Sequence, residues 1–157
     1  MQTYTQDIEK LLKEGNSIQF KPQGYSMYPV LIPGRDSVVV SPIEEGDNLK
    51  RGQVVLYRRY KENGEKDILV LHRIWKVKEQ GIYLVGDNQK EVEGPLQFHQ
   101  MLGIATTIYR KGKEISTENG MYRLFTGIWL LLRPVRPVIS KVVAGCKKML
   151  KTMKNNK

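Results

Sequence analysis

Apolar residues recur along most of this chain in short runs separated by turn-forming residues. Between residues 17 and 116, β-branched and apolar runs such as Ser37–Val40 and Ile68–Leu71 alternate with Pro-Gly, Glu-Asn-Gly and Lys-Gly turns. No ten-residue stretch with helical periodicity stands between these runs. The pattern predicts a mainly β protein whose central part, residues 17–116, is an antiparallel β domain.

The two ends of the chain differ from this central part. In residues 1–16 we predict a short helix over 3–14, because Ile8, Leu11 and Leu12 fall on one helical face and Gly15 can end the helix. Residues 117–157 form a third part, predicted to be a basic, amphipathic and helical tail. Its apolar block, Leu124–Leu132, is followed by arginine and proline.

The charge of the protein is concentrated in this tail. The net charge is +10, yet residues 1–120 carry 17 basic and 16 acidic residues. From position 121 onward there are no acidic residues and nine basic ones, namely Arg123, Arg133, Arg136, Lys141, Lys147, Lys148, Lys151, Lys154 and Lys157. The apolar block is far shorter than the roughly 20 residues that span a bilayer. We therefore do not expect a transmembrane helix there.

Three interpretations of the tail remain open. An apolar block beside basic residues suits peripheral contact with an anionic membrane through residues 121–157. Alternatively, Phe125, Ile128, Leu131 and Leu132 cover the β domain while the lysines face water. Binding of nucleic acid phosphates is the least favoured of the three, because it leaves the candidate chemistry described below without a role.

Length and composition fit one globular domain. The chain has 157 residues, of which 40% are hydrophobic and 27% charged, which argues against general disorder. One cysteine, Cys146, excludes an internal disulfide, and two histidines at unrelated spacings give no metal signature. We expect no cofactor, and the oligomeric state stays open.

The most informative motif is a serine on a predicted bend. Ser26 stands between Gly24, which can adopt backbone angles closed to other residues, and Pro29, which interrupts regular structure. A hydroxyl needs a base to become a good nucleophile. His72, on the apolar run that follows Asp67, could accept its proton. Asp87, in a Gly-Asp-Asn turn, could orient the imidazole or brace the site. An ordinary loop serine, a hydrogen-bonded strand histidine and a turn aspartate are the alternatives.

The order of these motifs resembles that of the serine peptidases that include type I signal peptidases and LexA-like self-cleaving proteins. The similarity covers about residues 17–116. Its five boxes are Ser26–Pro29, Ile32–Val40, Leu49–Tyr57, Val70–Ile74 and Gly86–Gln89. The second box carries one residue between its glycine and its aspartate that the family lacks, and Gln53 replaces the usual aspartate of the third.

The resemblance implies a serine endopeptidase that cleaves a peptide or protein precursor. Many members use a lysine base, whereas His72-Arg73-Ile74 is similar to the endoplasmic-reticulum-type branch, which uses a Ser-His pair. On this basis the catalytic residues would be Ser26, His72 and Asp87, with the oxyanion held by backbone amides near Ser26. Self-cleavage between Ala144 and Gly145 is a lesser hypothesis. The main alternative is a non-catalytic module that binds a peptide or joins a membrane assembly on the same scaffold.

The start of the chain bears on location. Residues 1–7 contain neither an apolar run nor a signal-peptide pattern. The sequence also lacks the helix-turn-helix domain expected of a LexA-like repressor. We therefore expect a cytoplasmic catalytic domain that makes peripheral contact with the inner membrane face.

Overall fold

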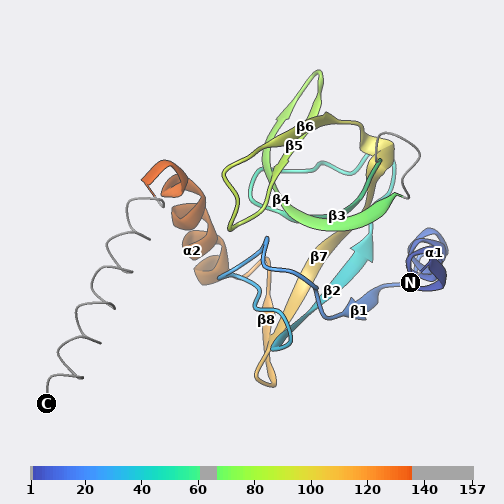
Figure 1. Cartoon of the computed structure of the whole chain (residues 1–157), viewed down its shortest axis with the longest axis horizontal. Coiled ribbons are helices and arrows are strands. Elements are labelled where there is room, and N and C mark those ends of the chain that lie inside the picture. The colour runs from blue at the N-terminus through green and yellow to red at the C-terminus, as the bar shows by residue number, and fades with distance from the viewer. Residues whose placement is uncertain (1, 61–66, 136–157) are drawn as a thin grey trace, which may run out of the picture.

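One antiparallel sheet of eight strands dominates the protein (Figure 1). The computed structural model describes residues 2–60 and 67–135. Seven strands are hydrogen-bonded in the order β1-β2-β7-β3-β4-β5-β6, and β8 pairs with β7. The strands are β1 (Ile18–Phe20), β2 (Asp36–Pro42), β3 (Val54–Arg59), β4 (Ile68–Lys78), β5 (Gly81–Val85), β6 (Glu93–Leu96), β7 (Met101–Arg110) and β8 (Lys113–Ser116). The predicted mainly β, antiparallel architecture is confirmed.

Both faces of the central strands are buried, so these strands carry continuous apolar runs. In β3, Val54 and Leu56 point into one core cluster, whereas Val55 and Tyr57 point into a second cluster on the opposite face. Strands β3 to β6 curl around the second cluster, as the upper part of Figure 1 shows. One face of β4 therefore lines this enclosed space, and His72 lies on that strand.

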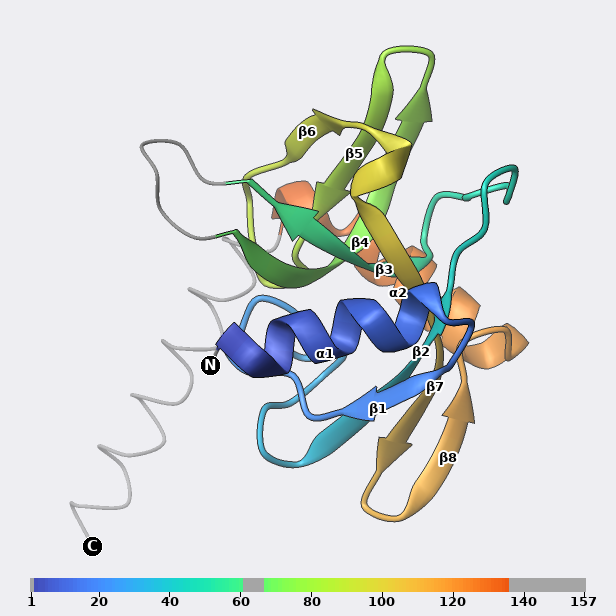
Figure 2. The same cartoon turned by 90° about the vertical axis from the view of Figure 1, so that its right-hand side faces the viewer.

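Helix α1 (Gln2–Lys13) covers the first core cluster on one side of the sheet (Figure 2). Ile8 and Leu12 are buried, and Glu9 is paired with Arg58 of β3. The expectation that Leu11 shares the buried face is wrong, because its side chain is 42% exposed at the edge of the helix. Gly15 ends the helix with a φ of 84°, a conformation that glycine adopts without strain.

Helix α2 (Gly120–Leu131) lies on the other side of the molecule from α1 (Figures 1 and 2). Asn119 caps it, since its side chain accepts hydrogen bonds from the amides of Met121 and Tyr122. Tyr122, Trp129 and the buried Leu130 face inward. The residues expected to cover the domain under the second interpretation of the tail are instead exposed: Phe125 (54%), Ile128 (48%), Leu131 (67%) and Leu132 (38%). That interpretation chose the wrong face of the helix.

Two 3₁₀ turns complete the described elements, η1 (Phe98–Gln100) and η2 (Arg133–Val135). No helix in residues 2–60 and 67–135 is long and apolar enough to cross a membrane. The hypothetical cleavage site at Ala144–Gly145, the single Cys146 and the basic residues from Arg136 onward lie outside the described residues.

Candidate active site

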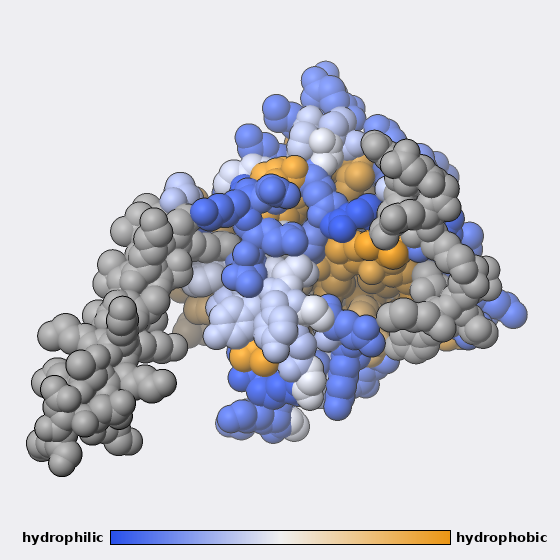
Figure 3. Space-filling view, in the orientation of Figure 1, coloured by the Kyte–Doolittle hydropathy of each residue, from blue (hydrophilic) through white to orange (hydrophobic). Residues whose placement is uncertain are grey.

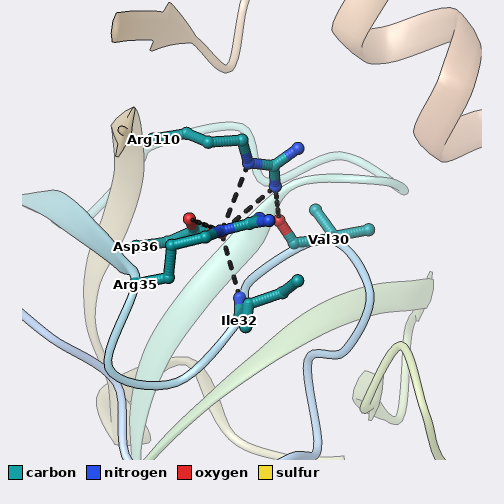
Figure 4. A network of polar contacts seen from close by, with 5 residues as sticks. All are labelled: Val30, Ile32, Arg35, Asp36 and Arg110. Carbon is teal, nitrogen blue, oxygen red and sulfur yellow. Dashed lines mark hydrogen bonds and ion pairs between the residues drawn. The ribbon is translucent and has the colours of Figure 1, made fainter. Parts of the chain in front are cut away.

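The segment that carries Ser26 is held at its far end by a buried carboxylate (Figure 4). Asp36, fully buried at the start of β2, accepts hydrogen bonds from the Ile32 amide (3.0 Å) and from the side chains of Arg35 and Arg110. Arg110 of β7 also donates to the Val30 carbonyl. Burial alone would raise the pKa of Asp36, but these donors outweigh it and lower the pKa. Residues 30–36 are thereby fixed to the sheet.

Ser26 itself lies against the Gly-Asp-Asn turn that follows β5. The Asn88 amide donates a 2.7 Å hydrogen bond to the Ser26 carbonyl oxygen. A Cβ atom at Gly86 would lie 2.7 Å from the same oxygen, which is closer than side-chain carbons approach a carbonyl group. The absence of a side chain at Gly86 is what lets the Ser26 backbone come this close.

His72 lies on β4, which is the neighbour of β5. Arg73 is paired with Val85 and Ile74 with Leu84, so one further step in this register places His72 opposite Gly86. Opposite residues share a face of the sheet and have Cβ positions roughly 5 Å apart. The backbone carbonyl oxygen of Ser26 occupies the space that a Gly86 side chain would fill. The Ser26 backbone therefore lies against the turn that follows β5, the strand that pairs with the one carrying His72.

The imidazole of His72 is almost completely buried, at 1% exposure, and one of its nitrogens has a carboxylate partner. His72 Nδ1 lies 3.2 Å from Glu93 Oε1 on β6, and the Tyr57 hydroxyl is 3.4 Å from the same nitrogen. A carboxylate can only accept, so Nδ1 carries the proton in this contact. In the neutral ring Nε2 is then the basic nitrogen.

Glu93 is the centre of this polar cluster. Tyr57 donates to its Oε2 at 2.5 Å, and Arg59 donates to both carboxylate oxygens. Burial would raise the pKa of Glu93, but the hydrogen bonds from His72, Tyr57 and Arg59 outweigh this effect and lower the pKa to about 2. Burial and the adjacent Glu93 carboxylate raise the pKa of Tyr57. Near neutral pH the cluster therefore contains an ionised Glu93 and a protonated Tyr57.

Asp87 forms an ion pair with the guanidinium group of Arg73. Its two oxygens accept from Arg73 Nε (2.8 Å) and Nη2 (2.7 Å), and both side chains are fully buried. Burial alone would lower the pKa of Arg73, but the Asp87 carboxylate reverses this and raises it. Arg73 also donates to the Gly52 carbonyl, and Trp129 Nε1 of α2 donates to the Asp87 backbone oxygen at 3.0 Å. This arrangement braces the turn beneath Ser26.

The structure thus brings all three predicted residues into one region but gives them different neighbours. Within the described residues, no hydrogen bond joins the side chains of Ser26 and His72 directly. The sequence reasoning missed Glu93 and Tyr57, the partners of the imidazole. Glu93 begins a short edge strand with no motif around it, and only the curled pairing of β4, β5 and β6 reveals it.

Two lysines on the strand of His72 do not have the surroundings of a catalytic base. Lys76 and Lys78 of β4 are exposed, and a lysine base needs burial to lose its proton near neutral pH. In the part of the chain that the structure describes, no cluster of three metal-ligating side chains occurs. Comparison with protein-family models, curated proteins and solved structures found no match. The family resemblance therefore remains a prediction based on its short motifs.

Proposed function

We propose that this protein is a serine endopeptidase in which Ser26 is the nucleophile and His72 is the general base and acid. The observation that supports the proposal is the contact between the Ser26 carbonyl and the turn after β5, because β5 pairs with β4, the strand that carries His72. The substrate class is a peptide or protein precursor, as in signal-peptidase-like enzymes. The lack of a direct hydrogen bond is compatible with this role, because such contacts often shorten only when substrate binds.

The chemistry follows from the groups present. Ser26 Oγ attacks the peptide carbonyl carbon while its proton passes to His72 Nε2. The C–N bond then breaks, the imidazolium returns that proton to the leaving amine, and a water deprotonated by His72 hydrolyses the acyl ester. Glu93 is a positioning residue in this scheme, since it holds the ring through Nδ1 and stabilises the imidazolium. Asp87 supports the turn through Arg73.

The decisive experiment compares the native protein with the Ser26→Ala variant in a proteome-wide cleavage assay and in labelling by a serine acylating probe. Both cleavage and labelling should be abolished, because alanine cannot form the acyl ester. Ser37→Ala is the matched control, because Ser37 is a serine on β2 whose hydroxyl only accepts a hydrogen bond from Gln19. Full activity in the Ser26→Ala variant would refute the proposal.

A non-catalytic peptide-binding module is the second candidate. Two exposed aromatic side chains, Tyr25 (66%) and Tyr28 (43%), flank Ser26 and offer a contact surface for an extended peptide. The two functions differ in the fate of a captured peptide. Binding without turnover, unchanged when His72 is replaced by glutamine, would favour the module and exclude the enzyme.

A further inference from the structure

One face of helix α2 is apolar and open to solvent. Its side chains recur at helical spacing along a single stripe: Met121 (76% exposed), Leu124 (60%), Phe125 (54%), Ile128 (48%), Leu131 (67%) and Leu132 (38%). The opposite face is already used, since Tyr122, Trp129 and Leu130 pack on the domain. The exposed apolar side chains of this stripe are therefore not part of the core. We call these six residues the α2 stripe.

Basic side chains border this helix. A cavity of about 380 Å³ beside α2 is lined by Lys50, Arg51 and Arg123 as well as by Leu131 of the stripe. One acidic residue, Glu118, also lines the cavity and lies 3.2 Å from Arg123. The lining of this cavity therefore combines apolar side chains with three basic residues and one acidic residue.

Arg51 of this lining and a further arginine, Arg133, lie around Trp75. The Arg51 guanidinium lies 4.6 Å from the centre of the Trp75 ring, and that of Arg133, just after α2, lies 5.2 Å from it. Tryptophan is enriched where a protein meets the region between lipid head groups and acyl chains, and the two guanidinium groups place positive charge beside this ring. In the face seen in Figure 3, the apolar areas form separate patches among hydrophilic residues, and the most extensive patch lies right of the centre.

We propose that α2 docks on an anionic lipid bilayer, with the α2 stripe inserted at the interface and the flanking arginines and lysines on the head groups. Apolar side chains gain from leaving water, and cations near an anionic surface add electrostatic attraction. The positive charge of this part of the chain favours this occupant. No acidic residue occurs from position 121 to the end, and the chain beyond the described residues adds seven more basic ones.

Other occupants fit these observations less well. A second copy of this chain would bring the same positive charge to the same surface. A nucleic acid would use the basic residues but would leave six exposed apolar side chains in water. An anionic bilayer would remove the apolar side chains of the α2 stripe from water and would also attract the basic side chains beside them. Because Trp129 of α2 donates to the Asp87 turn, docking through α2 would also hold the candidate active site close to the membrane.

The test uses the full chain and co-sedimentation with vesicles of phosphatidylcholine, with and without phosphatidylglycerol. We expect binding to the anionic vesicles that weakens with added salt. Leu124→Gln together with Phe125→Gln should weaken it about tenfold or more, because two inserted side chains are lost. Val77→Gln together with Val92→Gln is the control, since Val77 on β4 and Val92 in the loop before β6 are exposed valines outside α2. Circular dichroism should show that both double variants remain folded.

Each possible result either supports or overturns the proposal that α2 docks on an anionic bilayer. Equal binding by the stripe variant and the control would overturn the proposal, as would equal binding to neutral and anionic vesicles. If the stripe variant instead converts a dimer to a monomer in sedimentation without affecting vesicle binding, the stripe is a contact between copies and the proposal fails. Ser26→Ala should bind vesicles like the native protein, so this test is independent of whether the protein is a peptidase.

Discussion

The carbonyl oxygen of Ser26 accepts a 2.7 Å hydrogen bond from the Asn88 amide. At the candidate nucleophile, the backbone of Ser26 therefore packs directly against the backbone of the turn after β5. This close contact depends on Gly86, because a Cβ atom there would lie 2.7 Å from the Ser26 oxygen. The Arg73–Asp87 ion pair fixes the turn from below. The position of Ser26 is consequently set by the strand that neighbours the one carrying His72.

Gly86→Ala should displace Ser26. The added methyl group meets the Ser26 carbonyl and the Gln89 side chain, so we expect a loss of about 1–3 kcal/mol of folding stability and a large fall in acyl-probe labelling. Urea unfolding and labelling rates measure these effects. Gly127→Ala is the control, because a Cβ there meets nothing within 4 Å and helical alanine is favoured by roughly 1 kcal/mol. Normal labelling in Gly86→Ala would disprove the assigned role of this contact.

Asp87→Asn should act mainly on stability. It leaves the fully buried Arg73 guanidinium without its anionic partner, a change that typically costs about 3–5 kcal/mol. We expect a much lower urea midpoint, together with a pH–rate profile of native shape in whatever fraction remains folded. A changed profile would instead assign Asp87 to the imidazole.

Glu93→Gln should act mainly on turnover. The variant retains the shape of the side chain but removes the charge that faces His72 Nδ1, so we expect kcat to fall by roughly 10²–10⁴. Glu114→Gln, on the exposed β8, is the control. Native kcat in Glu93→Gln would remove Glu93 from the mechanism.

The depressed pKa of Glu93 also predicts a pH dependence of folding. The unfolded carboxylate takes up a proton near its ordinary value of 4.5, whereas the folded one does so only near 2. Its stabilising contribution is therefore complete above about pH 4.5 and is lost as the pH falls toward 2. Partial exposure reduces the contribution to about 1–2 kcal/mol. Urea unfolding at pH 7 and pH 3 should show a larger loss in the native protein than in Glu93→Gln, which keeps only the contributions of other carboxylates such as Asp36.

The sequence predicted the architecture better than the site. Apolar runs and turn residues indicated the antiparallel sheet, because burial and turn chemistry leave local signals. The bend at Ser26 and the turn at Asp87 were visible for the same reason. The role of Glu93 could not be predicted from the sequence, because it depends on β6 pairing with β5 after a long turn. No local sequence pattern indicates that pairing.

Helix α2 shows a second limit of sequence reasoning. The apolar block from Leu124 to Leu132 was visible, but it is apolar on nearly every side, so its pattern alone did not select the buried face. Tyr122 and Trp129 determine the orientation, because both pack against the first core cluster and the Trp129 indole nitrogen donates to the Asp87 carbonyl. Aromatic side chains with a polar end thus fixed the helix in a way that hydrophobicity alone did not predict.

The hydrogen bond from Trp129 to the Asp87 carbonyl gives the protein an intrinsic optical probe. Only two tryptophans are present, so Trp75→Phe leaves a single indole whose emission wavelength depends on the polarity at its nitrogen. Ligands that shift the turn beneath Ser26 would change that emission. Occupancy of the site could then be followed in real time without a label or a known substrate.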